Sequence, residues 1–420
     1  MNFVLFYHSL ISDWNNGHAH FLRGVAAELL ARRHHVTIFE PAGGWSLESL
    51  RAGHGETPIA DFHAAYPTLK SQFYSLDTLD LNETLDAADV VIVHEWNAPE
   101  LIARIGRHRA QTSGYRLLFH DAHHRAVTMS ASLAALDLSA YDGVLAFGEM
   151  IRDIYLQRGW TQRAWTWHEA ADTRVFRPLR DASDPARVGD LIWIGNWGDD
   201  ERTEELHEFL LEPVRRLNLA ARVHGVRYPQ PALDALQAAS IAYGGWLANY
   251  RVPDIFARFK ATLHVPRRVY RERLPGVPTI RVFEALACGI PLICAPWEDS
   301  ETLFRPGEDF LIARNGAAME QSLRVVLNDR DAAQSLAEHG RETILARHTC
   351  ADRVDELLGI CDALEIDLPA AKRGNQKAPC TLAKGGDQEI SSSFKQGDRE
   401  GISMTRVTPR KPHPSTAGRK

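Results

Sequence analysis

The segment 279–295 combines residue types that suit a phosphorylated ligand. It predicts a short helix with Thr279 as its N-cap and Gly289 as the residue past its C-cap, followed directly by a buried strand. Arg281 and Glu284 stand three residues apart, so they lie beside each other on that helix. The amide groups at a helix start attract anions, and a nearby carboxylate can accept hydrogen bonds from ribose hydroxyls. Taken alone, these residues fit an ordinary surface ion pair better.

A polar turn follows the first expected strand, at residues 8–21, with Gly17 as its single glycine. The turn therefore lacks G-x-G-x-x-G, the fingerprint of dinucleotide binding. Gly17 stands where the next helix is expected to begin, with Asn16 and His18 on either side. A glycine at such a place lets the backbone approach a ligand closely, although a plain surface loop is the alternative.

His120 ends the expected strand 116–120 and is followed by His123 and His124. Because α/β proteins bind ligands at the carboxyl ends of parallel strands, His120 is a candidate contact. The spacing of the three histidines fits no common zinc pattern, so no metal site is predicted. His94 also ends an expected strand, where a structural histidine is the better interpretation.

Short apolar runs alternate with helical patterns along the chain and must position these residues. The expected strands are 3–7, 36–40, 90–94, 116–120, 144–147 and 164–167, then 191–194, 221–224, 261–265, 291–295 and 310–313. This alternation predicts two doubly wound parallel sheets, and thus an α/β protein with two Rossmann-like domains. We expect these domains at 1–172 and 173–350, joined near 172–189. A final helical stretch is expected over 351–370.

The composition is that of a soluble globular protein of 420 residues, with 45% hydrophobic and 24% charged residues. A net charge of −6 gives no support for nucleic acid as a partner. Five cysteines without C-x-x-C spacing favour reduced thiols in the cytoplasm. The sequence begins with an expected strand and has no basic region before it, so we expect no secretory signal. No apolar run approaches the roughly 20 residues that span a bilayer. Peripheral membrane contact stays open.

The last fifty residues, 371–420, differ from the rest in composition. They carry 11 basic and 4 acidic residues among Gly, Ser and Pro, without hydrophobic periodicity. Such a segment has too little apolar surface to fold, so we expect a disordered basic tail. Binding of this tail to an anionic surface is the alternative.

Three segments together resemble retaining glycosyltransferases of the GT-B fold, whose two domains face a cleft. The first is Arg-x-Phe-Glu-Ala-x-Ala-Cys-Gly at 281–289, followed by Pro291, which is closest to the CgeB-like, spore-maturation-type branch of the family-1/family-4-like glycosyl transferases. The second is the stretch 169–178, and the third is Gly195-Asn-Trp with Arg202 downstream. In order and spacing these segments cover roughly residues 1–365.

The resemblance assigns roles to individual residues. Glu284 is expected to bind the ribose of a nucleoside diphosphate sugar, and Arg202 its diphosphate. The diphosphate would also contact the helix start at Thr279 and Arg281 and the loop at Gly195. Asn16, Gly17 and His18 would face the donor from the first domain, with His120 close to the transferred sugar. Relatives of this kind use no metal or further cofactor.

Two departures from the family pattern bear on activity. The usual Lys-Gly after Arg202 is missing, and Arg267 and Arg268 are the candidates to replace it. Many relatives carry a glutamate eight positions before the one at 284, where this chain has Gly276. From the resemblance as a whole, we expect a hexosyltransferase-like enzyme that acts on a glycan, lipid-linked or small-molecule acceptor hydroxyl. A degenerate nucleotide-sugar-binding scaffold and a GT-B-fold epimerase are the alternatives.

Overall fold

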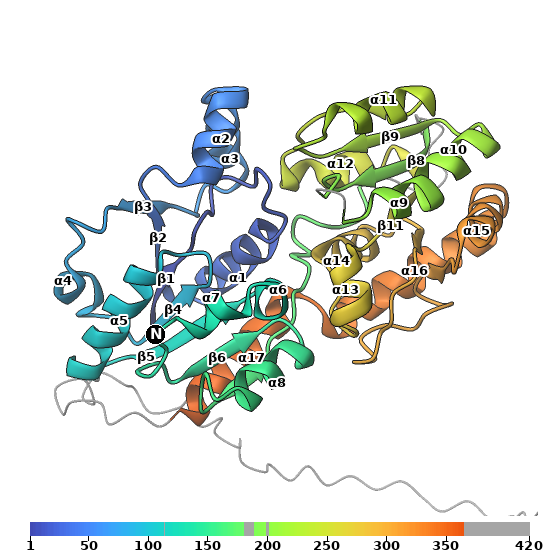
Figure 1. Ribbon diagram of the computed structural model, residues 1–420. Helices are drawn as coiled ribbons and strands as arrows, with labels where there is room; N and C mark the ends of the chain where they lie inside the picture. Colours follow the sequence, from blue (N-terminus) through green and yellow to red (C-terminus); the bar gives the residue numbers. More distant parts are fainter. Residues whose placement is uncertain (113, 180–188, 199–200, 365–420) are drawn as a thin grey trace, which may run out of the picture. The chain divides into compact units, whose positions relative to one another are not determined.

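Strands that are buried on both faces build a first parallel sheet in the N-terminal half (Figure 1). The computed structural model describes residues 1–112, 114–179, 189–198 and 201–364. The strands are β1 (Asn2–Phe6), β2 (His35–Pro41), β3 (Ser71–Tyr74), β4 (Val90–His94), β5 (Arg116–Asp121), β6 (Gly143–Ala146) and β7 (Ala164–Thr166). All pairings are parallel, in the order β3-β2-β1-β4-β5-β6-β7.

Helices cover both faces of this sheet. Successive side chains of a strand point to opposite faces, so each strand contributes residues to both helix layers. Phe3 and Leu5 pack on α1 (Ala19–Ala31) and α17 (Cys350–Ala363), whereas Val4 and Phe6 belong to the core formed with α5 (Pro99–Thr112) and α8 (Glu149–Gln157). The remaining helices of this half are α2 (Trp45–His54), α3 (Thr57–Ala65), α4 (Leu81–Leu85), α6 (Arg125–Thr128) and α7 (Ser130–Ala134).

A second parallel sheet follows in the C-terminal half, with the order β10-β9-β8-β11-β12-β13. Its strands are β8 (Gly189–Ile194), β9 (Ala221–His224), β10 (Ala242–Tyr243), β11 (Phe259–His264), β12 (Leu292–Cys294) and β13 (Leu311–Ile312). Two doubly wound parallel sheets are therefore present, which confirms the predicted fold class.

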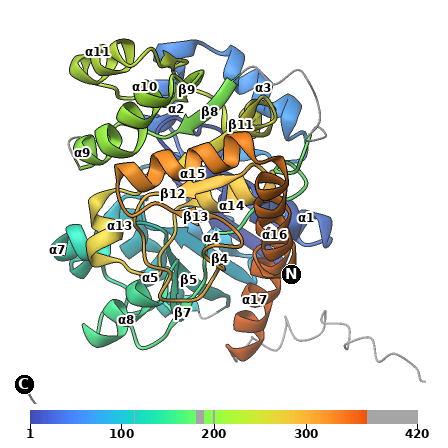
Figure 2. The ribbon, with the colours of Figure 1, turned by 90° about the vertical axis from the view of Figure 1, so that its right-hand side faces the viewer.

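The helices of this half also form two layers, which Figure 2 shows from a second direction. One sheet face packs on α10 (Glu212–Leu217), α11 (Gln230–Ala238) and α15 (Gly316–Asn328), the other on α12 (Val252–Phe256) and α14 (Ile280–Ala287). The other helices are α9 (Thr203–Leu206), the π-helix η1 (His207–Leu211), the 3₁₀ helix η2 (Asn249–Arg251), α13 (Arg268–Arg273) and α16 (Arg330–Arg347).

The last described helix, α17, packs against α1 of the first half. Thr349 and Asp352 form a capping box at its start, and Thr349 pairs with Ala171 in an isolated bridge. The Trp167 indole N–H donates to the carbonyl oxygen of Arg353 at 2.8 Å. The chain thus returns to the layer in which it began, and both sheets belong to one compact unit.

Several smaller expectations can be compared with the structure. Asp329 caps α16 by accepting from the backbone amides of Asp331 and Ala332, a role that aspartate commonly fills. Four cysteines are free and buried, at positions 288, 294, 350 and 361, while Cys380 lies outside the described residues. The middle of the expected junction, 180–188, and the expected tail also lie outside them. Among the described helices, none has the length and apolarity needed to cross a bilayer.

Candidate functional site

Each sheet reverses its strand order once, between β1 and β4 in the first and between β8 and β11 in the second. In open parallel sheets the loops that follow such a pair of strands form the ligand crevice. Here the loops after all four strands line one cavity of about 570 Å³. That volume is within the range of small-molecule sites. The cavity is therefore the candidate functional site.

Arg202 supplies a positive charge to the cavity wall at the start of α9. Its guanidinium donates to the backbone oxygens of Val265 at 2.8 Å and Asn196 at 2.6 Å, and lies 5.3 Å from the ring centroid of Trp193. Burial, and then the neighbouring charge of Arg267, lower the pKa of Arg202 to about 10. The side chain therefore stays charged at neutral pH. Within the described residues no carboxylate pairs with it.

Two more arginines extend this cationic wall. Arg267, after β11, lines the cavity and pairs with Glu201 at 3.1 Å. Arg281, in the first turn of α14, lines it as well. Arg268 follows Arg267 in the chain but does not line the cavity, and it pairs with Glu205 at 3.0 Å. Of the two candidate replacements for the missing lysine, only Arg267 therefore faces the cavity.

The start of α14 meets the first half of the chain at Gly17. A Cβ atom on Gly17 would lie 3.3 Å from Cγ2 of Ile280 and 3.8 Å from Nη2 of Arg281. Thr279 stands at the N-cap, but its hydroxyl pairs with Nε2 of His264 at 3.2 Å and caps no backbone amide. The helix start therefore faces the cavity without a side-chain cap, as an anion-binding terminus requires.

Behind this helix start, Glu284 is fully buried and does not line the cavity. Its carboxylate accepts hydrogen bonds from His20 at 2.9 Å and Asn249 at 2.8 Å, and pairs with Arg281. Burial alone would raise the pKa of Glu284, but the charge of Arg281 and the hydrogen bonds from His20 and Asn249 outweigh it and hold that pKa below its usual value. An ionised Glu284 therefore fixes the position of Arg281 at the wall.

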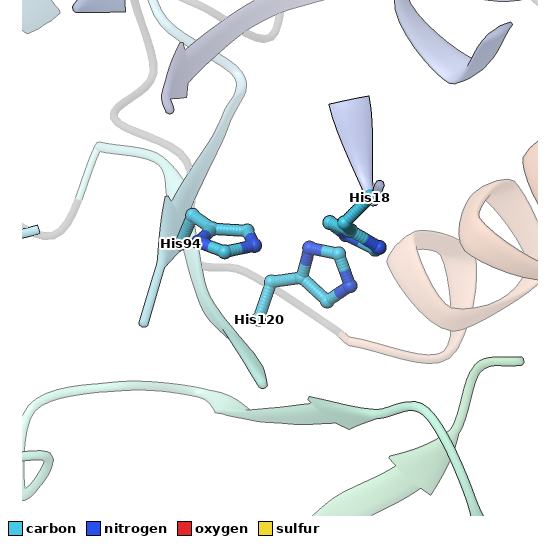
Figure 3. A group of neighbouring side chains, drawn as sticks. All are labelled: His18, His94 and His120. Atoms are coloured by element: carbon cyan, nitrogen blue, oxygen red, sulfur yellow. The ribbon is translucent and has the colours of Figure 1, made fainter. Parts of the chain in front are cut away.

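Histidines stand at the carboxyl ends of five strands. They are His8 just after β1, His94 in β4, His120 in β5, His224 in β9 and His264 in β11. All except His120 line the cavity, whereas His120 contacts His18 and His94, which do (Figure 3). Burial lowers the pKa of each of the five, to about 3 for His8 and His264. These imidazoles are therefore neutral at physiological pH.

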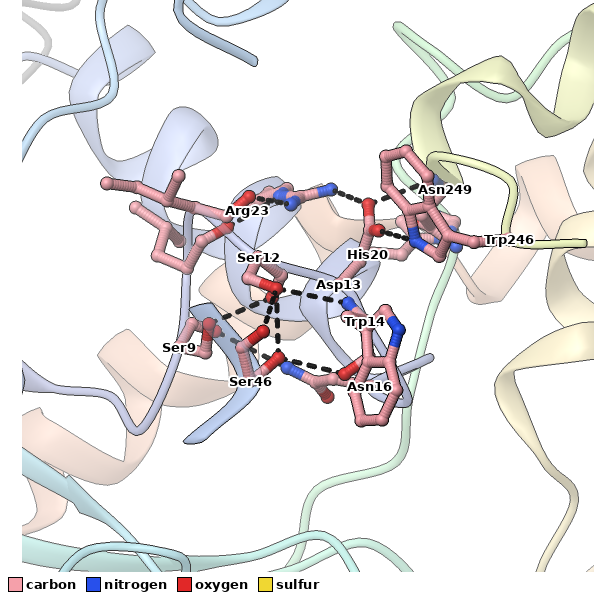
Figure 4. Close-up of polar contacts among 12 residues, drawn as sticks. Ser9, Ser12, Asp13, Trp14, Asn16, His20, Arg23, Ser46, Trp246 and Asn249 are labelled. Carbon is pink, nitrogen blue, oxygen red and sulfur yellow. Dashed lines mark hydrogen bonds and ion pairs between the residues drawn. The ribbon is translucent and has the colours of Figure 1, made fainter. Parts of the chain in front are cut away.

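Asp13 connects the loop after β1 with the second half of the chain (Figure 4). Its carboxylate accepts from Nη1 of the buried Arg23 at 2.9 Å, from the indole Nε1 of Trp246 at 3.0 Å and from the backbone amide of Asn249 at 2.9 Å. Asn196 also donates to the side-chain oxygen of Asn15 across the cavity. These contacts hold the two walls of the cavity together.

Comparison with known families gives a match in the second half. Residues 202–359 match a family model described as "Glycosyl transferase-like". This stretch includes Arg202, Arg267 and α14, and thus the cationic wall. No curated protein matched the sequence.

Comparison with solved structures extends over nearly all described residues. Sucrose-phosphate synthase from Thermosynechococcus elongatus is 15% identical, covering 87% of this chain and 99% of that one, with a TM-score of 0.58. HepE from Anabaena, in complex with UDP and glucose, is 11% identical over 87% and 100%, with a TM-score of 0.60. An alpha-glucosyltransferase in complex with UDP and DNA is 11% identical over 86% and 99%, with a TM-score of 0.62. The chain has the GT-B fold.

In this GT-B chain, most residues singled out from the sequence converge on the cavity. Those that line it are Asn16, Gly17, His18, Gly195, Arg202, Thr279 and Arg281. Two others do not. His120 is 1% exposed and separated from the cavity by other histidine rings, and Glu284 lies beneath the wall formed by Arg281. Neither residue therefore lies where it would directly contact a small molecule in the cavity.

Sequence reasoning missed several residues of the GT-B cavity. Asp13, Trp246 and His8 line it, as does Glu169, whose Oε1 lies 2.6 Å from Nδ1 of the predicted residue His18. The strand-end rule that selected His120 would have selected His8 too, because both stand where a parallel strand ends. No local pattern marks Trp246, since its place depends on the distant partner Asp13.

Proposed function

We propose that this protein is a glycosyltransferase that moves a sugar from a nucleoside diphosphate sugar to an acceptor hydroxyl. The observation that carries the proposal is the cationic wall of Arg202, Arg267 and Arg281, which lines the cavity between the two sheets of a GT-B fold. The match of residues 202–359 to the glycosyl transferase-like family supports it, because that stretch contains the same wall.

The diphosphate of the donor would lie against this wall and the start of α14. Loss of the nucleoside diphosphate leaves negative charge on its terminal phosphate, and fixed cations stabilise such charge as it develops, supplying several kcal/mol. Arg202 suits this role because two carbonyl oxygens orient its guanidinium and no described carboxylate neutralises it. With three arginines present, binding of the diphosphate would not depend on Mg²⁺.

Glu284 would act on the donor through Arg281 and not by touching ribose. Its carboxylate oxygens already serve His20, Asn249 and Arg281, and none of its surface is exposed. We assign Glu284 as a positioning residue, which leaves the ribose contact to the cavity lining. Gly195 and its neighbours after β8 line the cavity and offer backbone groups for that purpose.

The sugar and the acceptor would occupy the wall built by the first half. Asn16 and His18 would lie near the sugar, and Trp45 and Trp96 line the cavity with apolar faces on which an acceptor can stack. Transfer with retention of anomeric configuration and membership of the CgeB-like branch rest on the motif at 281–291. In that mechanism the protein chiefly positions the reactants and stabilises the leaving group.

The epimerase alternative has less support, because it needs carboxylates that are free for acid and base chemistry. The described lining contains Asp13 and Glu169 as its carboxylates. Asp13 is bound to Arg23, Trp246 and a backbone amide, and Glu169 to His18. The scaffold alternative predicts binding of the donor without its consumption, which separates it from an enzyme.

The test is calorimetric titration of the purified protein with UDP, GDP and their common sugar conjugates, with and without Mg²⁺. We expect one nucleotide to bind in the micromolar range, independently of Mg²⁺. Arg202→Ala should weaken this binding about 10- to 100-fold, since hydrogen bonds to charged groups contribute about 1.5–3 kcal/mol.

Arg268→Ala is the matched control, because Arg268 is a neighbouring arginine outside the cavity and its loss should leave binding unchanged. Absence of nucleotide binding, or equal loss in both variants, would overturn the proposed site. Donor that binds but is never consumed with any acceptor, as followed by NMR, would favour the scaffold. NMR of a product would give its anomeric configuration and would reveal an epimerised donor.

A further inference from the structure

Three histidines from separate parts of the first half meet at the edge of the cavity. His18 precedes α1, His94 ends β4 and His120 lies near the end of β5 (Figure 3). The three ring centroids form an equal-sided triangle, because each pair is 5.2 Å apart. One nitrogen from each ring lies within 4.8 Å of the other two.

Each of the three rings has at least one buried nitrogen without a protein partner among the described residues. These nitrogens are Nε2 of His18, Nε2 of His94 and both ring nitrogens of His120. His94 and His120 are each only 1% exposed. Buried polar atoms without a partner cost free energy, so three such rings gathered at one point need a reason.

The spacing fits a metal ion bound by three imidazoles. Zinc held by three histidine nitrogens at about 2.0–2.1 Å in a tetrahedron separates the ring centroids by about 5 Å and the nitrogens by about 3.4 Å. The centroids already have the first spacing, so rotations of the rings are enough to bring the nitrogens to the second. Neutral imidazole is also the nitrogen ligand that zinc prefers in proteins.

We propose that His18, His94 and His120 bind a divalent transition metal of the zinc type, with the fourth coordination position open to the cavity. His18 and His94 line the cavity, so an ion bound by them faces it. Sites with three protein ligands and one open position are those in which zinc binds and activates a water or hydroxyl oxygen. Such an oxygen could belong to water or to an acceptor hydroxyl.

Glu169 strengthens the proposal because it holds His18 in the form that a metal needs. Its Oε1 lies 2.6 Å from Nδ1 of His18, so the ring proton sits on Nδ1 and Nε2 keeps a lone pair for a metal ion. A carboxylate behind a histidine ligand is a recurrent support of zinc sites. His94 must move its ring proton from Nε2 to Nδ1 before Nε2 can bind an ion, since the backbone amide of Trp96 donates to its Nδ1 at 3.3 Å. That long hydrogen bond is lost when Nε2 binds the ion.

This ion is distinct from any metal on the diphosphate. The cationic wall of Arg202, Arg267 and Arg281 belongs to the second half, whereas the three histidines belong to the first. The metal site does not rest on the proposed function, and nucleotide binding and metal binding can fail independently. Retaining relatives use no metal, so the inference departs from what the resemblance implies.

The experiment uses untagged, full-length protein stripped of metal by chelator dialysis, without any nucleotide. Zn²⁺ is titrated in competition with a chromophoric chelator, and Co²⁺ is followed by its visible absorption, which is intense for tetrahedral sites. We expect one equivalent to bind tightly, with a tetrahedral Co²⁺ spectrum. His94→Phe and His120→Phe should abolish this binding while an aromatic ring keeps the packing. Glu169→Gln should weaken it about 10- to 100-fold.

His224→Gln is the control, since His224 is a strand-end histidine on the opposite wall and its loss should leave metal binding unchanged. Stoichiometric binding that persists in His94→Phe and His120→Phe would overturn the proposal, as would no binding by the wild type. If the phenylalanine variants do not fold, the melting temperature of the wild type decides. It should rise with added Zn²⁺, because a ligand of the native state stabilises it, and no rise would refute the site.

Discussion

His20 links the two halves of the chain by donating a hydrogen bond from Nδ1 to Oε1 of Glu284 at 2.9 Å. The backbone amide of Asp172 donates to Nε2 of His20 at 2.7 Å, so the ring proton must lie on Nδ1. Both side chains of the pair are fully buried. The pair therefore couples α1, together with the segment after β7 that contains Asp172, to the helix that carries Arg281.

Removal of this carboxylate should destabilise the fold as well as the site. Glu284→Ala leaves the donors of His20 and Asn249 and the charge of Arg281 without an acceptor, which we expect to cost about 3–5 kcal/mol. Glu284→Gln keeps the volume and one acceptor, so its cost should be about 1–3 kcal/mol. Urea unfolding followed by circular dichroism measures both.

Glu272→Ala is the control, because Glu272 is exposed and pairs with Arg271 on the surface. Exposed pairs contribute about 0–1 kcal/mol, so this variant should unfold like the wild type. If Glu284→Ala were no less stable than Glu272→Ala, the buried network would not exist in solution.

Much of the fold could be predicted from the sequence because buried parallel strands are continuous apolar runs. Val90–His94 and Ala221–His224 were expected with their observed bounds. The two strands that were missed, Ser71–Tyr74 and Ala242–Tyr243, are edge strands with exposed residues. An edge strand has one partner and half-exposed faces, so its sequence lacks the apolar run that marks a central strand.

The site was only partly predictable, because local sequence does not say which side of a loop a residue faces. Gly17 and Arg281 were expected to lie opposite each other, and the structure brings them together. Glu284 was expected at the ligand, but His20, which is 264 residues away, binds it from behind. His120 was selected over His94, although both end neighbouring strands and His94 is the one that reaches the cavity.

Buried histidines should make the protein sensitive to mild acid. Burial is the main cause that lowers the pKa of His264 to about 3 and of His124 and His348 to about 4, with nearby arginines adding to it. Below about pH 6.5 these histidines bind protons in the unfolded chain but not in the folded protein. The free energy of unfolding should therefore decrease as the pH is lowered from about 6.5 to 4. Each contributes a slope of about 1.4 kcal/mol per pH unit.

Buried carboxyl groups oppose this trend, because burial raises the pKa of Glu40, Glu95, Asp121 and Asp299. Burial raises the pKa of Asp121 to about 6, so below that pH the folded state binds a proton that the unfolded chain releases, and stability rises as pH falls. Urea unfolding at several pH values measures the net slope. His348→Leu should reduce it by about 1.4 kcal/mol per pH unit. An unaltered slope in His348→Leu would contradict the assignment.

Gly276 stands where many relatives carry a glutamate, and the backbone gives a reason. Its φ is +82°, and a Cβ atom would lie 2.6 Å from both Cγ of Glu301 and Oγ of Ser300. Glu301 cannot easily move, since it accepts from His168 at 2.6 Å and from an amide at 2.8 Å. Gly276→Ala should therefore lower the free energy of unfolding by about 1–3 kcal/mol.

Gly53→Ala is the matched control, because Gly53 lies within α2 and a Cβ there would meet open space. It should stabilise the protein by about 0.5–1 kcal/mol, as expected for alanine in a helix. Thermal unfolding of both variants compares them. Equal stability of the two would mean that the loop at Gly276 adopts another conformation, and a glutamate at this position would then be tolerated.

The contact between Asp13 and Trp246 should couple stability to donor binding, because both residues line the cavity. Asp13→Ala leaves the guanidinium of Arg23 buried and without its carboxylate, at a cost of about 3–5 kcal/mol. Trp246→Phe keeps an aromatic ring beside His54 and removes one donor to a charged acceptor, at a cost of about 1.5–3 kcal/mol.

Asp13→Asn, Trp246→Phe and the variant that combines them form a double-mutant cycle, which measures the coupling energy between the two side chains. A coupling energy near zero would show that the two walls are not joined here, and the nucleotide affinity of Trp246→Phe would then equal that of the wild type. A coupling of about 1 kcal/mol or more, with weaker nucleotide binding, would mean that this contact holds the cavity in its binding-competent form.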